Sequence, residues 1–575
     1  MEKNNLKKPA FAKSFGEARE VLLGNEAIVQ GALEAGVDFV TMYPGCPSAE
    51  IGDEFGRIAK DYGVHYEIST NEKVALEAAV GASFSGLKSL VAMKNFGLNV
   101  CSEVLLPLLY TGTKGAMVIV VGDDPNCWSS AQTEENSRAF SLMAHIPTLE
   151  PADAQECRDF VRLGFEISEK YKVPVMVRTT IRVAHQRGPV EFNEVIKLSS
   201  SKVGGANFVK NVHQYVTLPP RVLEMKKELL EKIEKIRKDF EVSKINPTSL
   251  KLRGANKLGI ITSGVSYLHT MEALRNLSAS RQGEDLQIPV LKIGSFYPLP
   301  KKKIAKFITG IKQVLVVEEL DPYIERELKI IAKDENLKVQ VIGKDMLPQI
   351  GELNVEILEN AIAKILKIKI KKNNLLTTNY SLQAPRRTSR LCDGCPYWYA
   401  FPTIKKVAPE GTIIGGDIGC NMIGGLSPHN MYDYMFCMGS SIGIGHGVSK
   451  ATGKNNKAIT IMGDGTFFHS GMAGLINAVY NKSNPLMIIL DNRITAMTGH
   501  QQNPGMGQNG MWQSAPEMNI EEIVKALGVK NVKTLDQGNP GELENVMKDF
   551  LIKDDVSVII CKRICAILDR RQKKQ

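Results

Sequence analysis

Stretches with helical and extended hydrophobic spacing alternate along the first part of the chain. Residues 27–35 have a helical pattern, whereas residues 37–42 and 118–121 are apolar runs of strand length. Such alternation predicts a parallel sheet between helices. A loop rich in Gly and Pro follows the first predicted strand at 43–47, and ligands usually bind at such carboxyl ends in α/β sheets. We therefore expect an α/β domain over residues 16–190 with a site at its strand ends.

Beyond this domain the pattern predicts a connector, a second α/β unit, a linker and a third unit. Residues 191–257 contain a charged helix and a Lys-rich stretch, and we interpret them as a helical, basic connector that packs on one side. The apolar face of that helix consists of Leu229, Ile233, Ile236 and Phe240. The second unit spans 258–372, the polar and basic linker 373–390, and the third unit 391–567. Further strands are expected at 258–262, 288–293, 313–317, 458–462 and 486–490.

Composition is typical of a soluble globular protein and does not name a function. Hydrophobic residues make up 43% and charged residues 23% of the 575 residues, and the net charge is +10. The basic excess is spread over a large surface, so no nucleic-acid footprint is indicated. Residues 1–15 have no signal-peptide core, and no apolar run of about 18 residues occurs. We expect a cytoplasmic protein that binds neither membrane nor nucleic acid.

Two predicted strands near the C-terminus end in motifs that carry oxygen ligands. The tripeptide Gly-Asp-Gly at 463–465 follows the run 458–462, and Asn492 follows the run 486–490. One carboxylate, one amide oxygen and a backbone carbonyl suit Mg²⁺, whose octahedral oxygen shell is completed by phosphate and water. Glycines beside the aspartate let the backbone approach phosphates closely. The pattern predicts a magnesium-diphosphate site.

The segment 463–492 resembles the thiamine-diphosphate-binding motif, which begins with Gly-Asp-Gly and ends in Asn after about this interval. A Gly-rich helix start at 438–443 supports the resemblance, and two unrelated turns are the alternative. The resemblance implies Asp464 and Asn492 as side-chain ligands of Mg²⁺ and Ile494 as a ligand through its carbonyl. The cofactor contacts that it implies are Gly463, Asp464, Gly465, Asn492, Gly439 and Ser440.

Enzymes with this motif need a glutamate from a second domain, which hydrogen-bonds the pyrimidine ring of the cofactor and helps to remove the thiazolium C2 proton. The candidate is Glu72, at the start of a small-residue helix over 71–82 that resembles the cofactor-activating segment of the family. Glu77 is the rival, and a solvated helix carboxylate is the alternative for both. Burial would raise the proton affinity of such a carboxylate, as acid–base relay requires.

Further motifs resemble the 2-oxoacid:ferredoxin oxidoreductases, and within them the indolepyruvate oxidoreductase alpha subunits. The motifs are Tyr-Pro-Gly-Cys-Pro-Ser at 43–48, Asn-Glu-Lys at 71–73, Met-Lys at 93–94, Leu-Asn-Val at 98–100, Cys-Asp-Gly-Cys-Pro at 392–396, Gly-Asp-Ile-Gly-Cys at 416–420, Cys-Met-Gly at 437–439 and Thr-Ala-Met-Thr-Gly-His-Gln at 495–501. The resemblance covers about residues 20–567. It implies that 16–190 is a pyrimidine-binding domain, 258–372 a transketolase-C-like domain and 391–567 a diphosphate-binding domain.

The same resemblance implies oxidative decarboxylation of a 2-oxo acid, with an aryl pyruvate such as indolepyruvate as the expected substrate. The acyl group passes to coenzyme A, and two electrons leave singly through iron–sulfur centres to ferredoxin, while the cofactor performs the difficult chemistry. Arg138 matches an arginine that binds the substrate carboxylate, for which its planar fork is suited; a surface arginine is the alternative. Cys46 replaces a threonine of the substrate loop, so a weaker thiol donor is expected there.

Ten cysteines occur without the pattern of a small disulfide-bonded domain, so buried thiols or metal ligands are expected. By resemblance, four of them are ligands of a cofactor-proximal [4Fe-4S] cluster, which requires four thiolates. These are Cys392, Cys395, Cys420 and Cys565, with Cys437 and Cys561 as rivals for the fourth place. A zinc site, which also accepts four thiolates, and unligated cysteines are the alternatives.

The chain ends before the ferredoxin-like domain with two further clusters that alpha subunits of this family normally carry. We therefore expect one cluster, an external ferredoxin or partner subunit as electron acceptor, a small beta- or gamma-type subunit and an oligomer. Two other functions remain open. One is a non-oxidative thiamine-dependent decarboxylase or transferase, and the other is a non-catalytic subunit that binds the cofactor.

Overall fold

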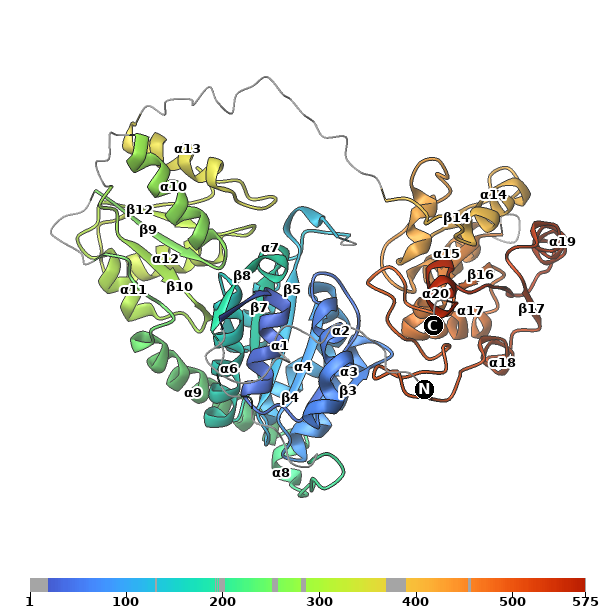
Figure 1. Cartoon of the computed structure of the whole chain (residues 1–575), viewed down its shortest axis with the longest axis horizontal. Coiled ribbons are helices and arrows are strands. Elements are labelled where there is room, and N and C mark those ends of the chain that lie inside the picture. The colour runs from blue at the N-terminus through green and yellow to red at the C-terminus, as the bar shows by residue number, and fades with distance from the viewer. Residues whose placement is uncertain are drawn as a thin grey trace. The chain divides into compact units, whose positions relative to one another are not determined.

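The chain folds into two compact units, and we describe each by itself. The computed structural model describes residues 19–129, 132–191, 193, 195, 202–250, 257–280, 286–368, 389–452 and 457–573. The first unit is Met1–Asn379 and the second Tyr380–Gln575. In the described residues, the first unit contains a seven-stranded, a four-stranded and a two-stranded sheet, and the second contains a five-stranded sheet (Figure 1). No helix in the described ranges combines the length and the apolarity that a bilayer crossing needs.

A seven-stranded sheet forms the core of the first α/β region. Its strand order is β11-β6-β7-β5-β4-β2-β3, and all neighbours are parallel except β11, which is antiparallel to β6. The strands are β2 (Phe39–Met42), β3 (His65–Ile68), β4 (Ser89–Lys94), β5 (Met117–Asp123), β6 (Thr148–Leu149), β7 (Val175–Thr180) and β11 (Ser295–Tyr297). The strands predicted at 37–42 and 118–121 are confirmed as β2 and β5, although β2 begins two residues later and β5 is longer.

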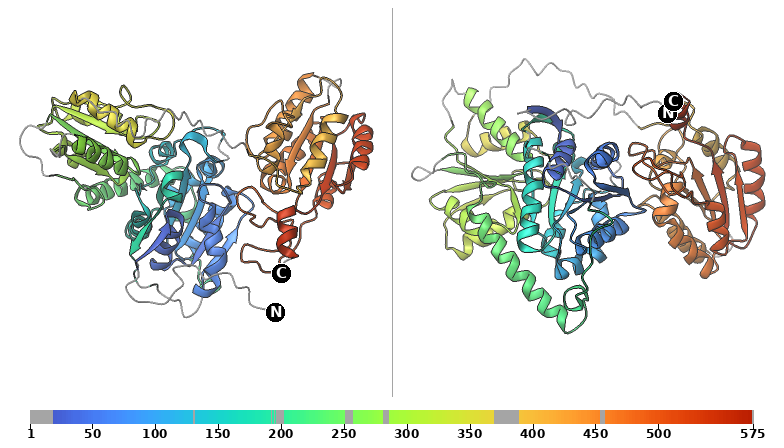
Figure 2. Two further views of the ribbon diagram at one scale, coloured as in Figure 1. Left: turned by 45° about the horizontal axis from the view of Figure 1, so that its top comes forward. Right: turned by 60° about the horizontal axis from the view of Figure 1, so that its bottom comes forward.

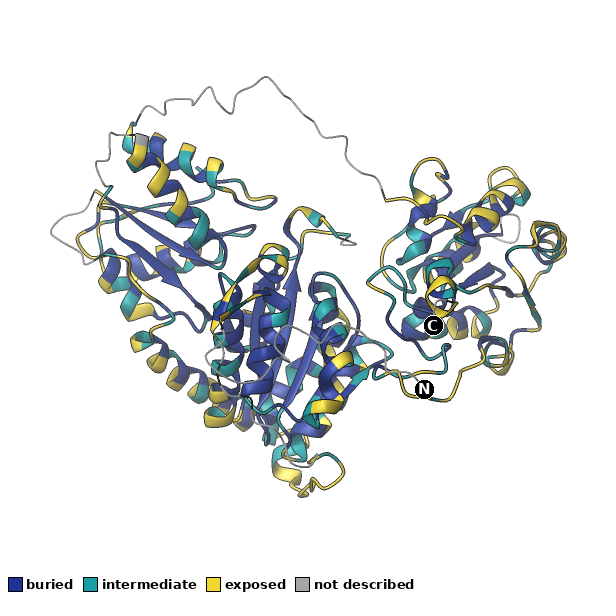
Figure 3. Cartoon of the chain, in the orientation of Figure 1, coloured by how far each residue is buried: buried dark blue, intermediate teal, exposed yellow. Residues whose placement is uncertain are grey.

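Helices cover both faces of this sheet, as Figure 2 shows. They are α1 (Gly24–Glu34), α2 (Ala49–Ile58), α3 (Glu72–Phe84), α4 (Asn95–Thr111), α5 (Arg138–Ala144), α6 (Ala154–Tyr171) and α7 (Ile181–His185), with the short ribbon β1 (Arg19–Leu23) and β8 (Arg187–Glu191) beside them. The strands are almost fully buried while the outer helix faces are exposed (Figure 3). Both faces of the sheet are covered, which explains why its strands read as continuous apolar runs.

The predicted connector contains α8 (Val212–Tyr215) and α9 (Arg221–Val242). The four apolar residues predicted to share one face of the charged helix are all buried on α9, together with Met225. They pack into the core formed by α4, α6 and the seven-stranded sheet. The prediction of a helix packed on one side is therefore confirmed.

A second, four-stranded parallel sheet follows within the same unit. Its order is β10-β9-β12-β13, and its elements are β9 (Leu258–Ser263), α10 (Ser266–Ser280), β10 (Val290–Ile293), α11 (Lys301–Ile308), β12 (Gln313–Val317), α12 (Tyr323–Asp334), β13 (Gln340–Ile342) and α13 (Val355–Leu366). The predicted strands at 258–262, 288–293 and 313–317 are confirmed as β9, β10 and β12. Strand β11 leaves this region to pair with β6, so the two sheets belong to one unit. The predicted linker 373–390 lies outside the described residues except for its last two.

The second unit is built on a five-stranded parallel sheet. Its order is β14-β15-β16-β18-β17, with strands β14 (Ile414–Gly415), β15 (Ile459–Gly463), β16 (Leu486–Asp491), β17 (Asn531–Leu535) and β18 (Ser557–Lys562). Its helices are α14 (Tyr397–Val407), α15 (Ser440–Thr452), α16 (Asp464–Thr466), α17 (Met472–Tyr480), α18 (Ile520–Ala526), α19 (Pro540–Leu551) and α20 (Ala566–Gln572), and its short turns are η4 (Cys420–Gly425) and η6 (Phe467–Gly471). The predicted strands 458–462 and 486–490 are confirmed. The whole chain is thus the multidomain α/β protein that the pattern predicts.

Candidate functional site

The two predicted oxygen-bearing motifs meet at one edge of the five-stranded sheet. Strands β15 and β16 are parallel neighbours, and Gly463 pairs with Leu490 in their register. Asp464 follows β15 directly and Asn492 follows the last residue of β16, so both side chains start from the carboxyl ends of adjacent strands. A cation that is bound by two loops needs both loops at the same edge of the sheet, and the carboxyl ends of β15 and β16 meet this condition.

Asp464 is a buried carboxylate held by a neutral partner. It is 2% exposed, and its Oδ2 accepts a hydrogen bond from the Asn503 amide at 2.9 Å. Burial, and then the nearby charge of Asp491, raise the pKa of Asp464 well above the ordinary range. The Asn492 amide oxygen accepts from the backbone N–H of Ile494 at 3.1 Å and keeps a second lone pair. A hard divalent cation would compensate this buried negative charge, so the donor set fits Mg²⁺.

The start of α15 is shaped by Asp417. Its carboxylate accepts hydrogen bonds from the backbone N–H of Gly439 at 3.0 Å and of Ser441 at 3.2 Å. Gly439 has a φ of +82°, and a Cβ there would lie 2.3 Å from Ser470 Oγ. Ser440 Oγ donates to the Cys437 carbonyl. Asp417 therefore fixes the predicted glycine-rich helix start, where N–H groups and the helix dipole favour phosphate.

The four predicted cluster cysteines come from three separate segments of the second unit. Cys392 and Cys395 precede α14, with the Cys395 N–H donating to the Cys392 carbonyl at 3.0 Å. Cys420 begins η4, and Cys565 precedes α20. Burial, and then Cys395, Cys565 and Cys392, raise the pKa of Cys420 to about 12. The four thiols are therefore close enough to act on one another electrostatically.

The cysteine group adjoins the strand-end oxygen site. The N–H of Cys565 donates to the Asn492 carbonyl at 3.0 Å. The Asn492 Nδ2 donates to the Tyr397 hydroxyl at 3.2 Å, and Tyr397 is buried within electrostatic range of Cys420 and Asp464. Asn492 thus belongs to the oxygen site and is bonded directly to the backbone of one cysteine of the group.

The rival cysteines have different surroundings. Cys561 lies on β18 inside the hydrophobic core, where burial alone raises its pKa, and Cys437 is exposed. Among the described residues, no three His, Cys, Asp or Glu side chains converge closely enough to hold a single metal ion.

Glu72 occupies a buried position in the first unit. It is the first residue of α3, capped by the Asn71 side chain, which accepts from the Val74 N–H at 2.9 Å. The side chain of Glu72 is packed tightly, because a Cβ on Gly97 of α4 would lie 2.7 Å from its Cγ. Its rival Glu77 is exposed and lies 3.9 Å from Lys73. The structure thus distinguishes the two glutamates by burial.

The predicted substrate loop lies between β2 and α2, at the strand ends of the seven-stranded sheet. Burial, and then the charge of Glu50, raise the pKa of Cys46 to about 11, so its sulfur stays a protonated, weak donor near neutral pH. Lys94 ends β4, and its side chain packs against Gly45, where an added Cβ would lie 2.8 Å from Lys94 Cγ. Cys46 and Glu72 are both within electrostatic range of Lys94.

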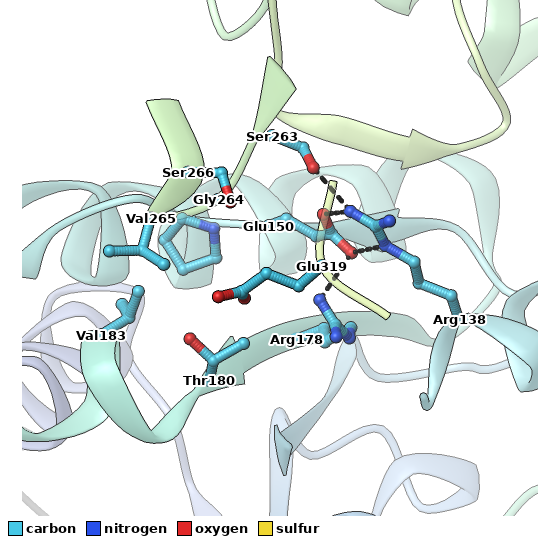
Figure 4. Close-up of a pocket in the computed structure, with 11 residues that line it drawn as sticks. Arg138, Glu150, Arg178, Thr180, Val183, Ser263, Gly264, Val265, Ser266 and Glu319 are labelled. Carbon is cyan, nitrogen blue, oxygen red and sulfur yellow. Dashed lines mark hydrogen bonds and ion pairs between the residues drawn. The ribbon is translucent and has the colours of Figure 1, made fainter. Parts of the chain in front are cut away.

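Arg138 is buried in an ion-pair network inside the first unit (Figure 4). Its Nε and Nη2 donate to the Glu150 carboxylate at 2.7 and 2.6 Å, and its Nη1 donates to Glu318 at 2.7 Å. Nη2 also donates to Ser263 Oγ at 2.5 Å. Burial by itself raises the pKa of Glu150, but Arg138 and Arg178 outweigh it and hold that pKa at about 2. The carboxylate-binding role of Arg138 stays a prediction, and four of its five N–H donors already have partners in the chain.

Three family models match the chain in succession. The model for pyruvate flavodoxin/ferredoxin oxidoreductase, thiamine diphosphate-binding, matches residues 30–243. The model for the indolepyruvate oxidoreductase domain matches residues 250–387. The model for the C-terminal thiamine pyrophosphate-binding domain of thiamine pyrophosphate enzymes matches residues 417–561, which include the strand-end site. Both α/β regions on either side of residues 250–387 are therefore of thiamine-diphosphate-binding type.

Curated relatives extend over nearly the whole chain. Indolepyruvate oxidoreductase subunit IorA of Pyrococcus horikoshii is 40% identical over 580 residues, covering 96% of this chain and 87% of the relative. IorA of Methanothermobacter marburgensis is 39% identical over 557 residues, with 96% and 87% covered. The chain belongs to the IorA family.

IorA-family chains are alpha subunits of thiamine-diphosphate-dependent 2-oxoacid:ferredoxin oxidoreductases, so membership identifies this chain as a subunit of an enzyme for oxidative 2-oxoacid decarboxylation. The solved 2-oxoglutarate:ferredoxin oxidoreductase from Magnetococcus marinus, with 2-oxoglutarate, coenzyme A and succinyl-CoA bound, is also similar to it. That likeness covers 60% of this chain and 65% of the other, with a TM-score of 0.48 and 18% identity.

Sequence reasoning missed three side chains of this IorA-family chain. Asp417 lies in the Gly-Asp-Ile-Gly-Cys motif at 416–420, in which the sequence assigned a role only to Cys420. Asn503 lies beyond the thiamine-diphosphate motif at 463–492. His469 lies in η6, one turn after the Gly-Asp-Gly tripeptide. Its Nδ1 lies 3.0 Å from Ser470 Oγ, which donates a hydrogen bond to the Met438 carbonyl. A π-helical turn next to a cofactor motif is a signal that only the structure reveals.

Proposed function

We propose that this chain oxidatively decarboxylates an aryl 2-oxo acid such as indolepyruvate and passes the electrons to ferredoxin. The overall reaction converts the 2-oxo acid, coenzyme A and two oxidised ferredoxins into acyl-CoA, carbon dioxide, two reduced ferredoxins and a proton. The observation that carries the proposal is that Asn492, a residue of the strand-end oxygen site, is hydrogen-bonded through its backbone carbonyl to Cys565 of the cysteine group. The cofactor site that releases the electrons and the cysteine group that would receive them would then be neighbours in the second unit.

Thiamine diphosphate with Mg²⁺ is the cofactor that we assign to the strand-end site. Asp464 and Asn492 would supply side-chain oxygens and Ile494 a carbonyl oxygen to the metal, and Gly463, Gly465, Gly439 and Ser440 would lie against the diphosphate. When bound, the cofactor supplies the carbon nucleophile and the electron sink for decarboxylation. In this scheme residues 391–567 form the diphosphate-binding domain and 16–190 the pyrimidine-binding domain, with 191–257, 258–372 and 373–390 as connector, transketolase-C-like domain and linker.

Glu72 is the residue that we assign to proton transfer with the cofactor ring. Its side chain is buried with its Cγ against Gly97, and Glu72 starts a helix at the strand ends of the seven-stranded sheet. A carboxyl group at this position could exchange a proton with a ring nitrogen of the cofactor through a hydrogen bond. Cys46, in the neighbouring loop, would contribute its S–H to the substrate.

One [4Fe-4S] cluster bound by Cys392, Cys395, Cys420 and Cys565 is the proposed electron outlet. The electrostatic influence of Cys395, Cys565 and Cys392 on Cys420 supports one shared site for the four thiols. Ferredoxin and a small partner subunit are the proposed partners, in an oligomer in the cytoplasm.

The cluster proposal predicts the iron content of the full chain. Anaerobically purified protein should be brown and contain about four irons and four acid-labile sulfides per chain. Cys420→Ser should lose most of the iron and the visible absorption, because a thiolate ligand is removed. Cys437→Ser is the matched control and should keep both. Fewer than about two irons in the wild-type chain, or loss of iron only in Cys437→Ser, would contradict the ligand set.

The activity is tested by following ferredoxin reduction with the full chain and its copurified partner subunit. Indolepyruvate and phenylpyruvate, supplied with coenzyme A, should reduce ferredoxin faster than pyruvate or 2-oxoglutarate does. Omission of coenzyme A should stop acyl-CoA formation. Carbon dioxide release at the same rate without any electron acceptor would instead support the non-oxidative decarboxylase.

A further inference from the structure

Lys94 is a partly buried cation without an anionic partner in the described part of the chain. Its Nζ forms neither an ion pair nor a hydrogen bond with any described residue, and it lies 4.8 Å from the centroid of the Phe96 ring. Burial lowers its pKa, and the acidic neighbours Glu72, Glu135 and Asp124 oppose that effect from a distance. An ammonium group placed in this way is costly unless a ligand or a partner compensates it.

The surroundings of Lys94 provide further unused donors. Asn95, the next residue, is 1% exposed, and its Nδ2 has no hydrogen-bond partner. Both residues stand at the N-terminus of α4, a helix of 17 residues whose dipole favours a negative charge there. An ammonium, a buried amide N–H₂ and a helix N-terminus at consecutive residues each favour a negative charge nearby.

Two of the three carboxylates near Lys94, Asp124 and Glu135, are already engaged or weakly charged, and the third is Glu72. Asp124 accepts hydrogen bonds from the N–H and hydroxyl of Ser129 at 2.7 Å, within its own loop. Glu135 accepts from the Asn99 amide at 2.9 Å, and burial raises its pKa to about 7. Neither carboxylate lies within ion-pair distance of Lys94.

The position of this site relates it to the proposed chemistry. Lys94 ends β4, which lies between β2 and β5, and its stem packs on the loop that carries Cys46. Glu72 is within its electrostatic range. The alternative cation, Arg138, gives its donors to Glu150, Glu318 and Ser263. We infer that Lys94, with Asn95 beside it, binds the carboxylate of the 2-oxo acid; this inference rests on the proposed function.

Binding of a carboxylate and of its neutral amide tests the inference without turnover. The full chain, loaded with thiamine diphosphate and Mg²⁺, is titrated with 3-phenylpropionate and with 3-phenylpropanamide, which lack the reactive 2-oxo group. Wild type should prefer the acid. Lys94→Met should weaken acid binding and raise the KM for phenylpyruvate by about 10- to 100-fold, the range for a hydrogen bond to a charged group. Amide binding and cofactor affinity should change less than about twofold.

Two variants keep the result decisive. Lys94→Arg should restore much of the preference for the acid, because it keeps the positive charge. Lys73→Met removes a half-buried lysine on α3 that pairs with the exposed Glu103 at 3.0 Å, and should behave as wild type. An unchanged preference for the acid in Lys94→Met, or an equal loss of acid and amide, would overturn the assignment. If Lys94 governs acid binding while no 2-oxo acid reduces ferredoxin, the proposed function fails and the anion site stands.

Discussion

Glu72→Gln is expected to lower turnover by about 100- to 10,000-fold, the usual contribution of a positioned acid–base group. Glutamine has nearly the same shape and fills the space beside Gly97, but it cannot take up or release a proton. Thiamine diphosphate should still bind, since the proposed diphosphate and metal ligands lie in the other unit. Steady-state ferredoxin reduction and calorimetric cofactor titration measure the two quantities separately.

Glu77→Gln is the matched control for this experiment. Glu77 lies on the same helix, but it is exposed and pairs with Lys73 at 3.9 Å. Turnover in Glu77→Gln should stay within about twofold of wild type, because exposed substitutions of this kind have small effects. If Glu77→Gln lost activity while Glu72→Gln kept it, the glutamate would be assigned wrongly. Full activity of both variants would support a subunit whose catalytic glutamate lies elsewhere.

Arg138→Met is expected to destabilise the first unit by about 3–5 kcal/mol, the cost of leaving buried charges without their partner. Glu150 and Glu318 are each 1% exposed, and Arg138 bonds to both at 2.6–2.7 Å. The network joins the seven-stranded sheet to the end of β12 in the four-stranded sheet. Removing Arg138 should therefore weaken the packing of these two sheets against each other. Urea unfolding monitored by circular dichroism gives the change in the free energy of unfolding.

Arg182→Met provides a comparison with the same change of side chain. Arg182 also pairs across these regions, with Glu352 at 2.7 Å, but its side chain is 55% exposed. Glu352 is 9% exposed, but it also accepts hydrogen bonds from Trp128 and Asn126, so replacing Arg182 should cost less than replacing Arg138, about 1 kcal/mol. If Arg138→Met instead left stability unchanged and only raised the KM for the 2-oxo acid, Arg138 would be the substrate ligand and Lys94 would not.

Strands and strand-end motifs could be predicted from the sequence because their signals are local. Strand β12 begins and ends where its apolar run does, and Gly-Asp-Gly and Asn492 each follow such a run directly. Parallel neighbours in a sheet bring their carboxyl ends together, so two local motifs predicted one site. The buried face of α9 was likewise visible in the spacing of its apolar residues.

Pairings between distant residues could not be predicted. Strand β11 has three residues, which are too few to show an alternation of apolar and polar positions. Its partner β6 lies far earlier in the sequence, at Thr148–Leu149. Arg138 resembles a substrate ligand in sequence, but Glu318, which is 180 residues away, engages it. The sequence places Lys94 in a family motif but does not show that its charge lacks a partner, because that depends on which residues surround it in the fold.

The Mg²⁺-dependent binding of thiamine diphosphate to the full chain is the most direct test of the central claim. Calorimetric titration of the wild-type chain should give one site per chain that disappears when EDTA replaces Mg²⁺. Asp464→Asn should abolish this binding, whereas Asp549→Asn, which changes an exposed aspartate on α19, should bind as wild type does. Uptake of the cofactor by Asp464→Asn with wild-type affinity, or no uptake by wild type with Mg²⁺ present, would contradict the account.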